Sequence, residues 1–262
     1  MKNYQTIKLE TKDSVLTVWL NRQEVHNAFN EVMIKEFIDV FEEINKDDEI
    51  RIVVLRGKGK SFCAGADLNW MRDVARYSYD KNYYESLNVS KCFYSIYTCK
   101  KPTIALVHGA AIGGANGFIT ASDIAIAEDE TVFSLSEVKI GVIPACISPY
   151  VVKRVGEYAA KELMITGRRI KGKEAESFRL INKSLAKNEF DEYVNSIIQN
   201  LKTSGPKAVT HCKNLIFEIS NKLTLEEAGE YTAKMIAEIR ISDEGQEGMA
   251  AFLEKRKPKW VE

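Results

Sequence analysis

The sequence predicts an α/β protein in which strand–strand–helix units repeat and a section made only of helices follows. Three observations support this fold class. Short apolar runs with strand-like alternation recur through the first half of the chain, and each of two buried runs leads into a glycine-rich turn and then a helical pattern. After Tyr158 the patterns are mainly helical, and no linker rich in Pro, Gly or Ser divides the 262 residues.

The N-terminal part contains both kinds of periodicity. Residues 4–20 alternate between apolar and polar side chains on either side of a polar break at residues 11–14, which predicts a hairpin. Residues 29–46 carry apolar side chains at three- and four-residue spacing, which predicts an amphipathic helix. The run IVVLRG predicts a buried strand, and helices are expected at about residues 68–77 and 83–97.

The middle of the chain repeats this order. The run TIALVHG predicts a strand, the glycine-rich AAIGGANG a turn, and the residues near 117–122 a helix. DIAIAEDETVFSLSE predicts two short strands, and residues 148–156 predict a helix that runs up to Gly156. Beyond it, helical patterns include YAAKELMITG and GKEAESFRLINK, followed by three longer segments: DEYVNSIIQNLKTS, PKAVTHCKNLIFEIS and LEEAGEYTAKMIAEIRIS.

Composition excludes several classes of function. Lys plus Arg and Asp plus Glu both number 37, so no surplus of positive charge indicates a nucleic-acid-binding protein. The N-terminus lacks the apolar region of a secretory signal, and the most apolar stretch, residues 104–127, is interrupted by polar residues as a buried core would be. Five cysteines without a CxxC pair predict reduced thiols and a cytoplasmic location, and three scattered histidines predict no metal site.

The stretch GKGKSFCAGADLNWM, residues 57–71, superficially resembles a phosphate-binding loop. The Walker pattern needs a glycine five positions before Gly59, and that position is Val54 inside the apolar strand. We therefore expect a different use of the loop.

Two loops have the same design, in which a buried strand enters a turn of small residues and then a helix: IVVLRGKGKSFCAGADLNWM and TIALVHGAAIGGANGFIT. Such turns leave backbone N–H groups unpaired at a helix N-terminus, where negative charge is favoured. Two such groups converging on one point would form an oxyanion hole for a carbonyl oxygen. The expected anion is an enolate rather than a phosphate.

These loops resemble those of the crotonase (enoyl-CoA hydratase/isomerase) superfamily. The resemblance extends over nearly the whole chain through LNR-x-x-x-HNAF at 20–29, SFCAGAD at 61–67, HGAAIGGANG at 108–117, FSLSEVKIGVIP at 133–144 and FLEKRKPKW at 252–260. It implies a ββα spiral core at residues 1–195, a helical oligomerisation section at 196–262 and a homotrimer or homohexamer. It implies a coenzyme A thioester as substrate, with no metal or other cofactor.

The resemblance also implies catalytic positions. The oxyanion amides fall on Ala66 and Gly114, and the acid/base carboxylate on Glu137. Hydratases of this family have a second glutamate where this chain has Gly117. The other acyl-CoA contacts implied are Arg22, Ala64, Asp67, Leu68, Gly117, Phe252 and Lys255.

Three of these positions, and Arg179 in addition, have further interpretations. Asp67 is well suited to cap the helix that follows it. Phe252 and Lys255, in the basic C-terminal run, would reach the CoA of a neighbouring subunit according to the resemblance. Arg179 departs from the family pattern because a glycine is usual there, and the sequence suggests no function for it beyond a reshaped turn.

The motifs AGADLNWM and GGANGF are similar to those of bacterial methylglutaconyl-CoA hydratase-like members, which belong to leucine or isoprenoid-acid breakdown. This resemblance implies a lyase that reversibly hydrates a 2-enoyl-CoA, such as 3-methylglutaconyl-CoA. Because one carboxylate also suits other enolate chemistry, an isomerase and a decarboxylase stay open. A non-catalytic acyl-CoA-binding protein is the alternative from another class.

Overall fold

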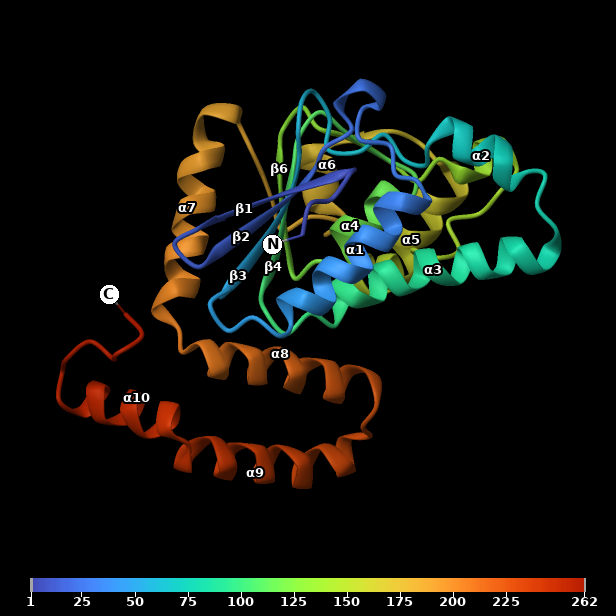
Figure 1. The fold of residues 1–262 in the computed structure, drawn as a ribbon. Coiled ribbons are helices and arrows are strands. Elements are labelled where there is room, and N and C mark those ends of the chain that lie inside the picture. The colour runs from blue at the N-terminus through green and yellow to red at the C-terminus, as the bar shows by residue number, and fades with distance from the viewer. Residues whose placement is uncertain (1, 262) are drawn as a thin grey trace. The chain divides into compact units, whose positions relative to one another are not determined.

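The structure is a computed structural model that describes residues 2–261. The chain forms two compact units (Figure 1). The first comprises Met1–Cys99 and Thr103–Glu192, and the second comprises Lys100–Pro102 and Tyr193–Glu262.

A six-stranded sheet forms the centre of the first unit, in the order β1-β2-β3-β4-β6-β9. Its strands are β1 (Ile7–Lys12), β2 (Val15–Leu20), β3 (Ile52–Gly57), β4 (Thr103–Val107), β6 (Ile124–Glu128) and β9 (Lys183–Leu185). Only the β1–β2 pair is antiparallel. The carboxyl ends of β3 and β4 therefore lie at one edge of the sheet, and both glycine-rich turns start there.

The N-terminal hairpin is confirmed, with a tighter turn than the sequence predicts. β1 extends to Lys12, and the turn consists of Asp13 and Ser14, whose φ values are 48° and 61°. Positive φ at both central residues is typical of the two-residue turns that match the twist of a hairpin.

A second, three-stranded sheet joins β5 (Ala110–Ile112), β7 (Val132–Ser134) and β8 (Ile170–Lys171). The sequence predicts β7, but it places residues 110–112 in a turn. Strands of two or three residues are too short to show a periodicity, so β5 and β8 cannot be predicted from the pattern of apolar residues.

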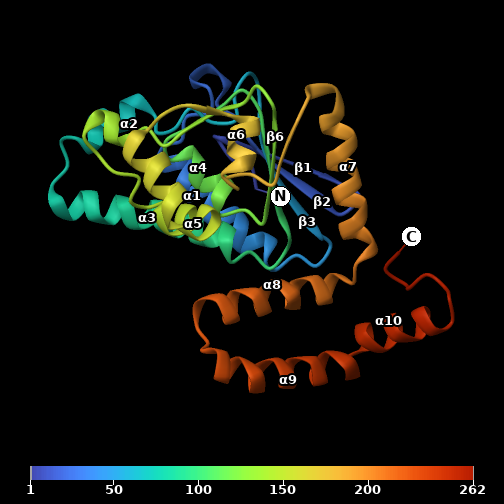
Figure 2. The same ribbon diagram turned by 180° about the vertical axis from the view of Figure 1, so that it is seen from behind.

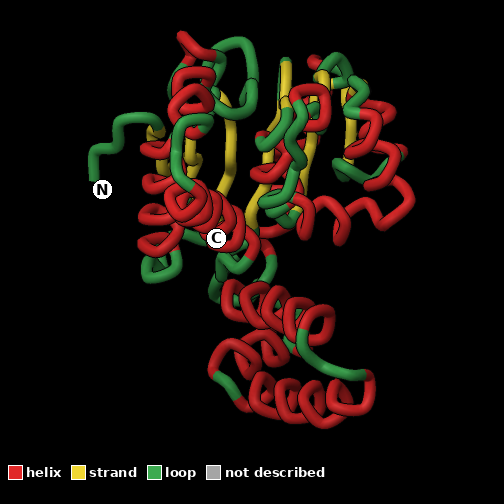
Figure 3. The backbone as a smooth tube through the Cα atoms, turned by 90° about the vertical axis from the view of Figure 1, so that its right-hand side faces the viewer, coloured by secondary structure: helices red, strands yellow, loops and turns green. Residues whose placement is uncertain are grey.

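Helices of the first unit gather on one face of the large sheet, as Figures 1 and 2 show for α1, α3, α4 and α5. Figure 3 looks onto this face, with helices in front of the strands. Their aromatic side chains meet there: Phe37, Phe93 and Phe118 are fully buried, and Phe118 contacts both other rings. The helices are α1 (Glu31–Ile44), α2 (Leu68–Val74), α3 (Tyr79–Tyr97), α4 (Ala115–Thr120), α5 (Ser148–Thr166) and α6 (Gly172–Ser177).

The structure differs from the prediction in two helical segments. The segments expected on either side of Gly156 form one element, α5, and Gly156 has non-helical angles (φ 77°, ψ 167°) that kink it. The helix expected over GKEAESFRLINK ends at Ser177 instead, because Arg179 takes a left-handed conformation (φ 60°) and β9 follows. A left-handed residue ends a helix.

The second unit is helical. Its helices are α7 (Lys187–Thr203), which begins in the first unit, α8 (Pro206–Asn221), α9 (Leu225–Ile241) and α10 (Asp243–Leu253). α8 and α9 run antiparallel (Figures 1 and 2). Thr224 and Glu227 form a reciprocal capping box that fixes the start of α9. Across residues 2–261, none of the helices is long and apolar enough to cross a membrane.

Candidate active site

The two glycine-rich turns lie side by side at the carboxyl ends of β3 and β4. Cys63 pairs with Ala111, and the N–H of Ile112 donates to the carbonyl of Cys63 at 3.1 Å. Gly65 approaches the second turn so closely that an added Cβ would lie 2.8 Å from the carbonyl oxygen of Ile112. Its φ of 97° also favours glycine.

The peptide unit between Gly65 and Ala66 is oriented by its carbonyl. The N–H of Phe29 donates to the carbonyl of Gly65 at 2.8 Å. In a trans peptide the N–H points opposite to the C=O, so the Ala66 N–H points away from Phe29. Within residues 2–261 this N–H donates no hydrogen bond, and Ala66 is partly exposed.

The peptide unit between Gly113 and Gly114 has the same arrangement. The carbonyl of Gly113 accepts from the backbone N–H of Asn116 at 3.0 Å and from its side-chain Nδ2 at 2.9 Å. The N–H of Gly114 therefore points away from this buried side chain. It too donates no hydrogen bond in the described part of the chain, and Gly114 lies just before the first turn of α4.

Phe29 connects the two turns. Its backbone pairs with Ala66, and its ring lies against Gly114, where an added Cβ would be 2.7 Å from the ring. The unpaired amides predicted at residues 66 and 114 thus belong to neighbouring turns that contact one residue. That both amides bind the same oxygen atom stays a prediction.

The carboxylate of Glu137 lies beside the second turn. Glu137 begins a 3₁₀ helix, Glu137–Ile140, and a Cβ placed on Gly113 would be 3.3 Å from its Oε1. Its Oε2 is buried and has no hydrogen-bond partner among the described residues. Burial raises the pKa of this carboxyl group above its usual value, against a lowering by its own backbone N–H. A positioned carboxyl group with a raised pKa is suited to general acid–base catalysis.

The space beside the Cα atom of Gly117, where a side chain would lie, is filled by other side chains. A Cβ there would be 2.5 Å from the ring of Phe93 and 2.6 Å from Cγ2 of Ile147. A glutamate therefore does not fit at residue 117 in this packing. Glu137 is left as the acid/base candidate beside the two turns.

Three buried side-chain polar atoms lack a hydrogen-bond partner within residues 2–261, and all three belong to this region: Trp70 Nε1, Asn116 Oδ1 and Glu137 Oε2. Trp70 packs edge-on to Phe29 at 5.8 Å between ring centroids. Buried polar groups are almost always paired, and unpaired ones are typical of functional sites. Trp70 could not be identified as a candidate from its residue type, because a single tryptophan on a helix usually belongs to the core.

Asn116 is fully buried and acts on the backbone. Its Nδ2 lies within hydrogen-bond distance of the carbonyls of Gly113, Ser134 and, at 3.3 Å, Ala111. The side chain therefore ties the second turn to β7, the strand that leads to Glu137.

Asp67 and Arg22 form a partly buried ion pair at 2.8 Å. Asp67 caps α2 as predicted, accepting from the N–H groups of Asn69 and Trp70. Burial opposes its ionisation, but the hydrogen bonds from Arg22 and from α2 lower its pKa overall. Arg22 also donates to the carbonyl of Ala28, so it holds the first turn in place, and its contact with CoA stays a prediction.

The other predicted CoA contacts lie on the surface. Ala64 and Leu68 are exposed on the loop around Ala66. Phe252 and Lys255 are exposed in the second unit, and Lys255 has a φ of 56°. Their binding roles stay predictions. Residues 2–261 hold no group of three or more His, Cys, Asp or Glu side chains arranged to bind a metal ion.

Unpaired amides at two turns beside a buried carboxylate are typical of enzymes that stabilise negative charge on a carbonyl oxygen. Comparison with known proteins narrows this class. The family model for enoyl-CoA hydratase/isomerase matches residues 10–262, and the chain belongs to this family of enzymes.

Relatives and solved structures agree with this assignment. The chain is 30% identical to a peroxisomal Delta(3,5)-Delta(2,4)-dienoyl-CoA isomerase of Arabidopsis thaliana, with 100% of this chain and 99% of the relative covered. It is 30% identical to a hydroxycinnamoyl-CoA hydratase-lyase of Pseudomonas fluorescens over 97% of this chain and 94% of the relative. A crystal structure of an enoyl-CoA hydratase from Shewanella pealeana superposes with a TM-score of 0.93 at 38% identity, covering 98% and 96% of the two chains. The predicted crotonase-like α/β fold is confirmed.

Proposed function

We propose that this enzyme reversibly adds water across the double bond of a 2-enoyl-CoA. The amides of Ala66 and Gly114 hold the thioester oxygen as it becomes an enolate, and Glu137 moves the proton. The observation that carries the proposal is the buried, unpartnered Oε2 of Glu137 beside Gly113, next to the unpaired N–H of Gly114.

One carboxylate suffices for this reaction. As a base, Glu137 takes a proton from the water that attacks the β-carbon, and the electrons of the double bond move onto the thioester oxygen. The enolate then collapses and its α-carbon takes the proton back from Glu137, so the two hydrogens and the oxygen of water are all accounted for. Two donors at the oxyanion contribute several kcal/mol to the transition state.

The acyl group we propose is branched or carboxylated, as in 3-methylglutaconyl-CoA. The support is the resemblance of AGADLNWM and GGANGF to that subgroup, together with the glycine at residue 117. The apolar groups of Phe93 and Ile147 stand where a second carboxylate would otherwise lie. We further propose a cytoplasmic homotrimer or homohexamer without a metal cofactor.

An isomerase is the second candidate. Two relatives about as similar to this chain as the hydratase-lyase are named dienoyl-CoA isomerases. Moving a double bond needs the same enolate and one base, so the carboxylate beside Gly113 serves this reaction equally well.

Incubation with 3-methylglutaconyl-CoA, crotonyl-CoA and a 3,5-dienoyl-CoA, followed by mass spectrometry, separates the candidates. Hydration adds the mass of water and removes the enoyl-thioester absorbance. Isomerisation changes the absorbance at constant mass, and loss of carbon dioxide identifies a decarboxylase. Tight acyl-CoA binding without turnover of any of these would contradict the proposal.

A further inference from the structure

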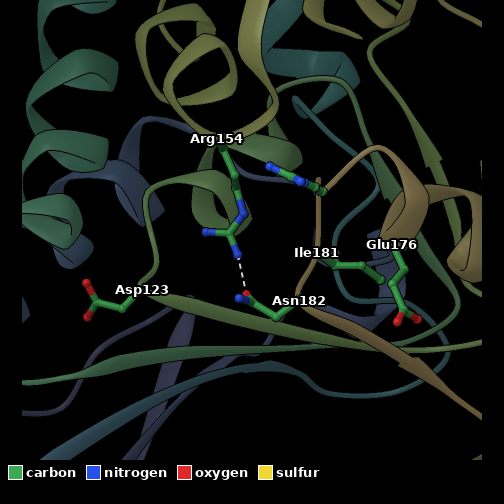
Figure 4. A pocket seen from close by; sticks show the side chains of 6 residues that line it. Asp123, Arg154, Glu176, Ile181 and Asn182 are labelled. Carbon is green, nitrogen blue, oxygen red and sulfur yellow. Dashed lines mark hydrogen bonds between the residues drawn. The ribbon is translucent and has the colours of Figure 1, made fainter.

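A polar cavity lies at the amino ends of β4, β6 and β9, whereas the candidate active site lies at the carboxyl ends of β3 and β4. It has a volume of about 400 Å³ and is lined by Asp123, Arg154, Glu176, Arg179, Ile181 and Asn182 (Figure 4). Asp123 directly precedes β6 and binds Thr103 at the start of β4, whereas the two glycine-rich turns follow the ends of β3 and β4. The proposed acyl-CoA chemistry uses none of these six residues.

Arg154 lies half-buried in this cavity, and no carboxylate within residues 2–261 forms an ion pair with it. Its guanidinium donates to the carbonyls of Leu180 and Ser122, each at 2.8 Å, and to Oδ1 of Asn182 at 2.6 Å. Burial lowers its pKa to about 10, only partly offset by the charge of Asp123. All three acceptors are neutral, and a desolvated cation is costly unless an anion compensates it. Nη1 and Nη2 each keep an N–H for a further partner.

Asn182 and Arg179 add further donors. The Oδ1 of Asn182 accepts from Arg154 and from the N–H of Ala125, which fixes the orientation of the amide and leaves Nδ2 without an acceptor within residues 2–261. The guanidinium of Arg179 makes no hydrogen bond or ion pair with the described residues. Its backbone is left-handed (φ 60°), a conformation that is unfavourable for a residue other than glycine. Such strain is typical of functional positions.

The two carboxylates of the cavity are bound elsewhere. Asp123 accepts from the backbone N–H and the hydroxyl of Thr103, and Glu176 pairs with Lys183 at 3.0 Å and accepts from the N–H of Ser184. In Figure 4 they lie on opposite sides of the hydrogen-bonded pair Arg154–Asn182. The space between them therefore presents donors in excess of acceptors.

We propose that this cavity binds a phosphate group between Arg154, Arg179 and the Nδ2 of Asn182. Guanidinium groups match the oxygens of a phosphate better than other cations do, because two parallel N–H groups can bind two oxygens. The cavity is larger than one phosphate ion, so the group can be inorganic phosphate or the phosphate of a nucleotide.

Isothermal titration with inorganic phosphate and with AMP tests the proposal, at an ionic strength held constant with chloride. Tighter binding of AMP would identify a nucleotide as the source of the group, and tighter binding of inorganic phosphate would identify the free ion. Arg179→Gly removes one donor and relieves the backbone strain, and Asn182→Asp keeps Oδ1 but replaces the Nδ2 donor with negative charge. We expect each variant to bind at least about tenfold more weakly, the value of one charge-assisted hydrogen bond.

Arg240→Gln is the matched control, because it removes an exposed arginine of the second unit and the same formal charge. It is expected to bind phosphate as the wild type does. The proposal fails if neither ligand binds the wild type, if Arg179→Gly binds both ligands unchanged, or if Arg240→Gln weakens binding equally. Turnover of acyl-CoA is measured in parallel and is expected to be the same in Arg179→Gly and in the wild type.

Discussion

At the scale of single residues, the candidate site depends on two backbone N–H groups and one carboxylate oxygen that have no hydrogen-bond partner within residues 2–261. The carbonyl of Gly65 accepts a hydrogen bond from Phe29, and that of Gly113 accepts from Asn116. The N–H groups of Ala66 and Gly114 therefore point away from these donors. The Glu137 carboxyl is kept without a partner for Oε2. Substitutions at Glu137, Asn116 and Gly117 test these roles.

Glu137→Gln is expected to lower kcat by at least about 100-fold, because the amide cannot take up a proton. The same change should raise the free energy of unfolding at neutral pH by about 1 kcal/mol, because it removes a buried charge. The pKa of Glu137 is raised on folding, so folding favours its protonated form. The stability difference should therefore shrink as the pH falls below that pKa, and chemical denaturation at several pH values measures it. A constant difference would contradict the assignment.

Asn116→Ala is expected to lower kcat about tenfold or more while KM changes little, because the orientation of the Gly114 N–H matters most when the oxygen is negative. The absorbance shift of a bound chromophoric enoyl-CoA, which reports polarisation of its thioester, should decrease at unchanged affinity. Thr120→Val is the control, since it removes a buried hydrogen bond from the same helix. Equal effects of both changes would show that Asn116 only stabilises the fold.

Gly117→Ala should lower the free energy of unfolding by about 1–3 kcal/mol, because its methyl group overlaps Phe93 and Ile147. Gly229→Ala, in the open middle of α9, is expected to raise stability by about 0.5–1 kcal/mol instead. Thermal and denaturant unfolding measure both. If Gly117→Ala were as stable as the wild type, the space beside residue 117 would be open and a second carboxylate could fit there.

At the scale of elements, α2 is tied to the first turn through Asp67. Asp67→Ala removes the cap of α2 and leaves Arg22 without its partner, so we expect the free energy of unfolding to fall by about 3 kcal/mol. The pKa of Asp67 is lowered on folding, so its contribution exists above the pKa of the unfolded chain and is lost as the pH falls through the folded pKa. The wild type and the variant should converge in stability in acid. A loss that persisted unchanged there would contradict this role.

At the scale of the whole molecule, both units carry large exposed apolar side chains. In the second unit these include Leu225 and Phe252, which are 95% and 83% exposed in the single chain. Apolar side chains that gather into a large exposed patch mark interaction surfaces, and these side chains are available to a contact between copies of the chain. We expect a particle of three or six chains in solution by light scattering, and Phe252→Asp should weaken assembly, CoA binding or both. A monomer with full activity would contradict the predicted homo-oligomer.

Much of the fold could be predicted from the sequence, since the hairpin, α1, β3 and β4 have clear periodicities and the two glycine turns have distinctive residues. The short strands β5 and β8 and the early end of α6 could not, because two or three residues show no period and a left-handed Arg179 is a tertiary outcome. The motif positions identified Glu137 and Gly117 as candidates. The clash at Gly117 and the unpaired Trp70 Nε1 depend on residues distant in the sequence, which only the folded chain brings together.

The packing around residue 117 also bears on the history of this enzyme. A mutation that introduced an acidic residue at this position would meet Phe93 and Ile147, and the chain would lose stability before it gained any chemistry. Placing a second acid here therefore takes coordinated replacements at residues 93, 117 and 147, which lie on three separate segments. If codons change one at a time, the acidic substitution at residue 117 comes with a loss of stability and is selected against. A chain with Phe93 and Ile147 in this space is therefore expected to keep a single acid.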